Sequence, residues 1–238
     1  DNPNAIGYVG FAYSEGLNRL DLTSECGITS SASNFAVKTE EYPLGRRLYL
    51  YNRADNLPAD AKSFLDYVLS PEADDAIAKS SFVNFAVERT AQPQSRTDNL
   101  FTELTNQREI ALANQMRADL GDWDRLSTTV RFPTGSSILG QKELNDIDRL
   151  IAYLEDLPKD TRVAVVGFAD NVGRFDNNIG LSGRRASTVA NAIAQIGGDR
   201  VSHIQFETKA YGELAPLVCN TADSGRTINR RVELWAES

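Results

Sequence analysis

The chain has 238 residues, 41% of them hydrophobic, and a formal net charge of −8 at neutral pH. This length suits one large domain or two modest ones, and the apolar fraction is that of a soluble protein with a buried core. The negative charge, without any basic tract, makes nucleic acid and anionic membranes poor partners. The sequence contains no apolar stretch long enough for a membrane-spanning helix. No signal peptide is visible, so we expect that one was removed or that the chain is shortened.

The two cysteines and the single histidine limit the chemistry that the chain can perform. Cys26 and Cys219 lie far apart and match no metal-ligand spacing. A disulfide between them would suit an oxidising compartment, but two free thiols or a bond to another chain are equally compatible. With His203 as the one histidine, a histidine-based triad or a zinc site has little material, and no metal or cofactor is expected.

Residues 1–90 predict strands first and helices afterwards. The apolar stretch at 5–13 and the alternating stretch at 47–51 are typical of strands. Pro58 predicts the start of one helix and Pro71 the start of a second, shorter one. Such a set of short elements makes a thin core, so we interpret this region as part of a larger domain.

Between residues 91 and 123 we expect a linker and a connector helix. Residues 89–98 are polar, contain one proline and lack periodicity, as linkers do. Residues 99–123 place apolar side chains among charged ones, which predicts a loosely amphipathic helix packed on a neighbouring domain.

Residues 124–238 have the clearest pattern, with elements in the order β-α-β-α-β-β. Apolar residues recur every three or four positions between 144 and 154 and again between 186 and 196, which predicts two helices. The apolar run at 162–168 predicts a central strand buried on both faces. Strands are also expected from 127, at 204–208 and at 232–234. We therefore predict a mixed α/β fold with right-handed crossovers and helices on one face of the sheet.

Two charged residues of this region could form a binding site. Asp170 directly follows the buried strand, at the rim where open α/β sheets bind ligands. Arg185 lies about two turns into the second helix, beside its apolar stripe, and we expect it to point toward the sheet. A simple surface ion pair between them, worth roughly 0–1 kcal/mol, is the favoured explanation from spacing alone. The alternative is an open cleft in which the carboxylate binds an ammonium and the guanidinium binds a carboxylate of an amino acid headgroup.

These residues also belong to motifs of a known family. The stretches GFADN (167–171), LSGRRA (181–186), YGE (211–213), CN (219–220) and GRTINRRVEL (225–234) resemble the OmpA-like peptidoglycan-binding domain over about residues 126–236. The resemblance implies helices packed on a mixed sheet, and binding of the diaminopimelate of the cell-wall stem peptide. It implies that Asp170 takes the ammonium group and Arg185 the carboxylate.

The same resemblance implies further residues of the pocket. The positions that line it correspond to Thr134, Gly135, Ser136, Ser137 and Asn178. Arg230, in the closing motif, is either a ligand contact or a salt bridge at a strand end. Phe168 and Ala169 replace the polar pair that usually precedes the aspartate, which lowers the expected affinity.

The first half of the chain has a resemblance of its own. NPNAIGYVGFAY (2–13), YPLGRRLYLY (42–51) and SFLDYVLSPEADDAIAKSSFV (63–83) resemble the carboxyl-terminal portion of a phosphate-type periplasmic solute-binding protein. The Ser-Gly-Thr loop that supplies phosphate-binding amides in that family is missing, so no ligand residue is assigned. Open strand edges of a shortened domain can pair with a second copy, which makes a homo-oligomer one expectation.

The sequence thus predicts a non-enzymatic module that binds peptidoglycan in the periplasm, on a cell-wall-associated protein attached to the outer membrane. The alternative is a periplasmic protein that binds phosphate or another solute and is tethered to the wall. An enzyme is disfavoured because no nucleophile or metal-ligand set accompanies Asp170.

Overall fold

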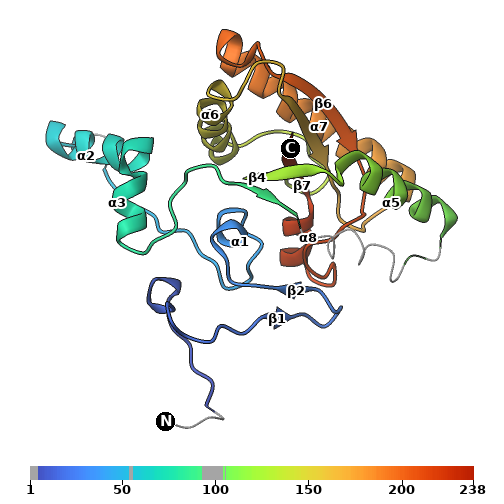
Figure 1. Ribbon diagram of the computed structural model, residues 1–238, viewed down its shortest axis with the longest axis horizontal. Helices are drawn as coiled ribbons and strands as arrows, with labels where there is room; N and C mark the ends of the chain where they lie inside the picture. The colour runs from blue at the N-terminus through green and yellow to red at the C-terminus, as the bar shows by residue number, and fades with distance from the viewer. Residues whose placement is uncertain (1–4, 54–55, 93–103, 105) are drawn as a thin grey trace.

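The computed structural model describes residues 5–53, 56–92, 104 and 106–238. Its main element is a five-stranded sheet with the strand order β3-β4-β7-β5-β6 (Figure 1). The strands are β3 (Arg89–Ala91), β4 (Trp123–Arg131), β7 (Arg231–Glu237), β5 (Arg162–Gly167) and β6 (Gln205–Ala210). β5 and β6 are parallel, and β7 lies between β4 and β5, antiparallel to both. The predicted mixed α/β fold is confirmed.

Two long helices, α6 (Gln141–Glu155) and α7 (Phe175–Gly197), cover one face of the sheet. Their predicted apolar stripes are buried: Ile147, Ile151 and Ile193 are fully inaccessible and pack with Val163 and Val165 of β5. α7 ends where the sequence predicted, at Gly197, and a short 3₁₀ helix η5 (Gly198–Val201) follows. This layer forms the larger of the two hydrophobic cores.

The second face of the sheet is covered as well, which corrects the expectation of helices on one face only. Helix α5 (Gln107–Leu120) buries Ala113, Met116 and Leu120 against side chains that include Phe168 and Trp235 (Figure 1). The apolar run of β5 reflects this arrangement, because Ala164 and Val166 face the second core while Val163 and Val165 face the first. Among the described residues, no helix combines the length and the apolar character needed to cross a bilayer.

The amino-terminal region holds short elements that lie outside the main sheet. They are η1 (Phe11–Tyr13), β1 (Leu22–Thr23), β2 (Thr29–Ser30), α1 (Asn34–Lys38), α2 (Ala59–Leu69), η3 (Pro71–Ala73) and α3 (Asp74–Lys79). The helices predicted after Pro58 and Pro71 are confirmed. The strands predicted at 5–13 and 47–51 are not formed, and Leu48, Tyr49 and Tyr51 are exposed. An alternating stretch becomes a strand only when a neighbouring strand pairs with it.

The linker prediction is wrong at its first residues. Arg89–Ala91 form β3 and pair antiparallel with residues 124–126 of β4. Residues 93–98 and 99–103 lie outside the described residues. The division of the chain into 1–90, 91–123 and 124–238 stays a prediction.

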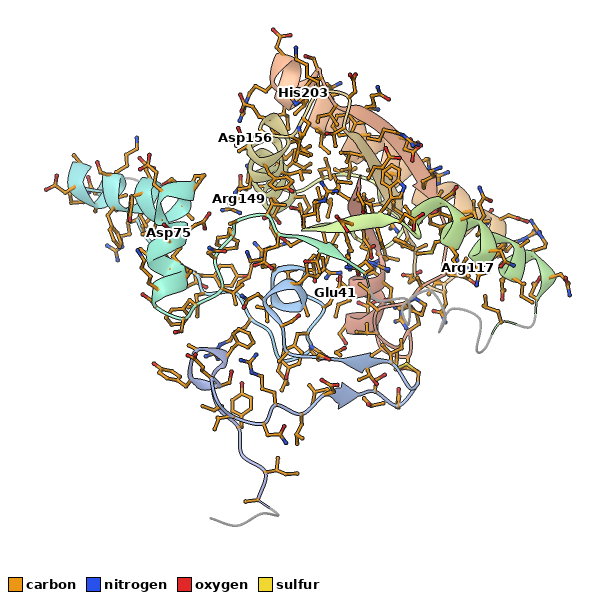
Figure 2. The ribbon with its side chains drawn as sticks, viewed as in Figure 1. Glu41, Asp75, Arg117, Arg149, Asp156 and His203 are labelled. Carbon is orange, nitrogen blue, oxygen red and sulfur yellow. A yellow bond between two sulfur atoms is a disulfide. The ribbon has the colours of Figure 1, made fainter. Side chains whose placement is uncertain are left out.

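Two neighbouring glutamates attach the amino-terminal region to the sheet. Glu41 forms an ion pair with the fully buried Arg125 of β4, and Figure 2 shows it between the amino-terminal segment and the sheet. Glu40 pairs with Arg131 of β4 and with Arg47, which in turn lies 3.3 Å from Asp146 of α6. These particular contacts between distant parts of the chain are electrostatic.

A disulfide makes a second attachment. Cys26, which follows β1, is bonded to Cys219, which precedes the short helix α8 (Asp223–Asn229). The two Cα atoms are 5.8 Å apart although the residues are separated by 193 positions in the sequence. Of the alternatives that the sequence left open, the structure has the intrachain bond.

The contact between β5 and α7 should not tolerate a side chain at Gly167. A Cβ atom there would lie 2.0 Å from the carbonyl oxygen of Ser182, which is helix backbone. We expect Gly167→Ala to lower the free energy of unfolding by about 3 kcal/mol. Gly183→Ala is the matched control, because its Cβ would meet Ala210 at an ordinary 3.5 Å and alanine favours the helix. Urea unfolding followed by tryptophan fluorescence tests both variants, and equal stability of Gly167→Ala and the unaltered protein would contradict the packing described.

The attachment through Glu40 should weaken in acid. Burial raises the pKa of the Glu40 carboxyl, but the charges of Lys142, Arg47 and Arg131 outweigh that effect, and its pKa falls below the usual 4.5. A carboxyl with a depressed pKa stabilises the fold above its unfolded-state pKa and loses this contribution as the pH falls through its folded-state pKa. We expect Glu40→Gln to lower the unfolding free energy by about 1 kcal/mol at pH 7, with the difference shrinking as the pH falls through the folded-state pKa of Glu40.

Glu143→Gln is the control for this experiment, because within the described residues the one charged group that Glu143 contacts is Lys142, at 3.9 Å. It should leave the unfolding free energy within about 0.5 kcal/mol. A Glu40→Gln effect that persists unchanged at acid pH would show that the carboxylate charge is not what holds this segment.

Candidate functional site

Asp170 lies just beyond the carboxyl end of β5, as the sequence predicted. Phe168 and Ala169 continue the strand and are held by backbone hydrogen bonds to Arg231 and Gly212. One carboxylate oxygen of Asp170 accepts a hydrogen bond from the backbone N–H of Val172, at 3.1 Å. The residue is only 6% exposed. Its position is therefore fixed by the two strands on either side of β5 and by the turn that follows it.

Arg185 projects from α7 to the same end of the sheet, which confirms its expected direction. Its Nε donates to the carbonyl oxygen of Ser136 at 2.9 Å, and its two terminal nitrogens donate to those of Pro133 and Phe168 at 3.1 and 3.4 Å. The guanidinium also lies 5.3 Å from the ring centroid of Phe132. α7 begins at Phe175, so residues 171–174 connect Asp170 to this helix.

Arg185 is a buried cation without a carboxylate partner. It is fully inaccessible, and within the described residues its hydrogen-bond acceptors are three neutral carbonyl groups. Burial lowers the pKa of Arg185 to about 10, although the charge of Asp170 opposes this fall. The group is still protonated at neutral pH, and an uncompensated buried charge of this kind is typical of functional sites.

The ion-pair partner of Asp170 is Arg230, not Arg185. A terminal nitrogen of Arg230 lies 2.8 Å from the second carboxylate oxygen of Asp170, and both side chains are buried. Arg230 also donates from Nε to the carbonyl oxygen of Phe132 and from its other terminal nitrogen to the hydroxyl of Thr227. The simple Asp170–Arg185 ion pair, which the spacing favoured, is therefore not formed.

Asn178 lies on the first turn of α7 and ties the loop after β5 to the loop after β6. Its side-chain amide donates to the backbone carbonyl of Asp170 at 3.2 Å and to the carboxylate of Glu213 at 2.5 Å. One turn further along the helix, the Ser182 hydroxyl accepts a hydrogen bond from the N–H of Gly212. The LSGRRA and YGE motifs thus meet at this end of the sheet.

The loop predicted to line the pocket covers Arg185. Thr134 and Gly135 are exposed, Ser136 and Ser137 are half-buried, and Gly135 adopts a φ of +65°, which favours glycine. The carbonyl groups of Pro133 and Ser136 in this loop accept hydrogen bonds from Arg185. The exposed residues 171–174 directly follow Asp170. The open cleft suggested by the sequence is therefore wrong for this structure, in which the two charges are buried beneath two exposed loops.

Several residues that contact this cluster were given no role by the sequence. Phe132 supplies a carbonyl to Arg230 and a ring face to Arg185, while Glu213, Thr227 and Asp223 contact Asn178 or Arg230. Glu213 stands in the YGE motif, so its motif was noted but no role was assigned to it. Thr227 likewise stands in the GRTINRRVEL motif without an assigned role, whereas Asp223 gave no signal in the sequence.

The cluster can recognise a ligand through charge and hydrogen bonding. Its groups are carboxylates, guanidinium groups, amides and hydroxyls, and within the described part of the chain no group of histidine, cysteine or acidic residues could hold a metal ion. His203 lies at the opposite end of β6, where its ring nitrogen contacts the carbonyl oxygen of Leu157 (Figure 2).

Comparison with known proteins identifies the domain that carries this site. Residues 131–230 match the OmpA family, so this part of the chain is an OmpA-family domain. Over 109 residues the chain is 34% identical to the probable lipoprotein YiaD of Escherichia coli, covering 46% of this chain and 48% of that protein. It is 36% identical over 107 residues to the peptidoglycan-binding protein ArfA of Mycobacterium bovis, covering 44% of this chain and 31% of ArfA.

Among solved structures, the carboxyl-terminal domain of Helicobacter pylori MotB matches with a TM-score of 0.41 and 26% identity, over 46% of this chain and 84% of that domain. The chain spans about a third to a half of the length of the curated relatives that it matches. The family match does not extend into residues 1–90, so the resemblance of that region to a solute-binding protein stays a prediction.

The buried Asp170–Arg230 pair should be coupled energetically. Removing one partner of a buried ion pair leaves the other charge unpaired and costs about 3–5 kcal/mol at most. We expect Asp170→Asn and Arg230→Gln each to lower the unfolding free energy, and the double variant to cost less than their sum by about 1–3 kcal/mol. The exposed Arg200–Glu155 pair is the control, with an expected coupling below about 1 kcal/mol. Urea unfolding of the four proteins in each double-mutant cycle makes the test. Additive effects at Asp170 and Arg230 would disprove an energetic coupling between them.

Proposed function

We propose that residues 124–238 are a non-catalytic module that binds peptidoglycan, and that the guest at the site is the diaminopimelate of the stem peptide. The observation that carries this proposal is the buried guanidinium of Arg185, which is hydrogen-bonded to neutral carbonyl groups and lies near enough to Asp170 to feel its charge. The OmpA-family match over residues 131–230 and the likeness to ArfA, which is named a peptidoglycan-binding protein, support it.

Each charge of the guest has a partner in this proposal. The side-chain end of diaminopimelate carries one ammonium group and one carboxylate, so it is a small zwitterion. Arg185 has five N–H donors, of which its three carbonyl contacts use only part, and it binds the carboxylate. Asp170 accepts hydrogen bonds from the ammonium. Thr134, Gly135, Ser136, Ser137 and Asn178 line the guest, as the family resemblance implies.

The guest reaches these groups when the loop at 133–137 moves. This loop covers Arg185 through two carbonyl groups, and it has an exposed tip with a glycine at positive φ. A carboxylate is a stronger acceptor for a guanidinium than a neutral carbonyl is, so it replaces them at little cost. Affinity is modest, because one small zwitterion buries little area.

In this proposal the module attaches its protein to the cell wall in the periplasm of the cell envelope. An intrachain disulfide agrees with an oxidising compartment. The sequence-based alternative, a tethered protein for phosphate or another solute, gains no specific support from the contacts of residues 5–53 and 56–92.

Binding to purified sacculi tests the proposal. We expect Asp170→Asn and Arg185→Lys each to weaken cosedimentation at least about tenfold, since losing one charge-assisted hydrogen bond costs about 1.5–3 kcal/mol. Asp199→Asn and Arg200→Lys are the matched controls, because both residues are exposed and lie past the far end of the 23-residue helix α7. Circular dichroism at the assay temperature verifies that each variant is folded. Full binding by both site variants would rule out this site.

Comparing two types of peptidoglycan gives a second, independent test. Lysine at the third position of the stem peptide keeps the side-chain ammonium but lacks the second carboxylate. We expect lysine-type sacculi to bind at least about tenfold more weakly than diaminopimelate-type sacculi. Free meso-diaminopimelate should compete with binding to the diaminopimelate type. Equal binding to both types would show that Arg185 does not read a carboxylate.

A further inference from the structure

Arg230 occupies the acceptor that the proposed guest requires. Its terminal nitrogen NH1 lies 2.8 Å from one Asp170 carboxylate oxygen, while the other oxygen accepts the Val172 N–H. In this state the negative charge of Asp170 is neutralised from within the protein. An ammonium group that approaches Asp170 therefore competes with a guanidinium already in place.

A second carboxylate stands on the other side of the same nitrogen. Oδ1 of Asp223 is 3.8 Å from NH1 of Arg230, and the Asp223 side chain is 74% exposed at the start of α8. The remaining nitrogens of Arg230 are anchored, Nε on the Phe132 carbonyl at 3.1 Å and NH2 on the Thr227 hydroxyl at 2.6 Å. Only the NH1 end needs to change partner, and the change requires a movement of about one ångström.

We propose that Arg230 is an internal competitor for Asp170 and that it turns to Asp223 when the guest's ammonium binds. This inference rests on the proposed function of the site. A buried guanidinium that lost its partner would destabilise the protein strongly, so without Asp223 the release of Asp170 would oppose binding. With Asp223 nearby, the free-energy change of the exchange is small, because Arg230 has a carboxylate partner both before and after the guest binds.

Phe132 connects this exchange to the carboxylate half of the site. Its carbonyl anchors Arg230, its ring faces Arg185, and the chain continues directly into Pro133, whose carbonyl binds Arg185. When a carboxylate displaces the loop from Arg185, the anchor of Arg230 moves with it. The two halves therefore respond together, and the site favours a guest with both charges over an amine or a carboxylate alone.

Calorimetry with meso-diaminopimelate and with pimelate tests the exchange. Pimelate has the same carbon chain and carboxylates but no ammonium, so the ratio of the two affinities measures the contribution of the ammonium group. We expect Arg230→Gln to raise this ratio at least about threefold, because the competitor is gone. Asp223→Asn should lower it by a similar factor, because Arg230 loses its second partner.

Arg174→Gln is the control. Arg174 is an exposed cation on the loop that borders Asp170, so removing it changes the local charge without removing a described contact to Asp170. Its affinity ratio should stay that of the unaltered protein. Asp223 is exposed, so Asp223→Asn keeps the test valid even where Arg230→Gln folds poorly.

The outcomes separate this inference from the proposed function. If the unaltered protein binds diaminopimelate, Asp170→Asn does not, and Arg230→Gln and Asp223→Asn leave the ratio unchanged, then Arg230 is only a structural partner of Asp170 and the competitor is disproved. If these variants lower the affinities for diaminopimelate and pimelate by the same factor, the competitor is likewise disproved. If the unaltered protein binds neither compound, the proposed function and this inference both fail.

Discussion

The need of buried guanidinium groups for oxygen acceptors organises this molecule. Arg125, Arg185 and Arg231 are fully buried and Arg230 nearly so. A buried cation persists only where acceptors surround it, and here they come from segments far apart in the sequence. Arg125 has Glu41 as its acceptor, and Arg185 has the carbonyl groups of Pro133, Ser136 and Phe168. Arg230 is held by Phe132 and Asp170, and Arg231 by Ala215 and Glu233. These contacts fix the loops at the carboxyl end of the sheet and join the amino-terminal region to it.

The same requirement explains why the charges of the proposed site are buried beneath the loops. In the proposed function, three carbonyl groups stand in for the guest's carboxylate at Arg185, and Arg230 stands in for its ammonium at Asp170. Arg185 thus has neutral acceptors that are weaker than a carboxylate, and Asp170 has a cationic partner that can turn away from it. A site of this kind avoids the cost of exposed, unpaired charges while keeping its binding groups in position. In the proposed function, the exposed loop at 133–135 is the part that must yield.

The sequence predicted the fold of residues 124–238 well, because its helices and central strand have strong periodicity. The stripe at Ile147 and Ile151 and the run in β5 depend only on local pattern and burial. The sequence failed at 5–13 and 47–51, where strand formation depends on a pairing partner. At the site it placed Asp170 and Arg185 at one end of the sheet, but it could not show that Arg230 takes Asp170. That choice depends on β7 lying between β4 and β5, a long-range feature that no local pattern encodes.

The disulfide between Cys26 and Cys219 has a mechanical consequence for a protein held under tension. It bridges 193 positions of sequence. When the chain ends are pulled apart, the covalent sulfur bridge carries the load directly from Cys26 to Cys219. This path bypasses the backbone between them, which includes Asp170 and Arg185. Stretching would therefore load α8 and β7 directly, and through Arg230 it would reach the ion pair with Asp170.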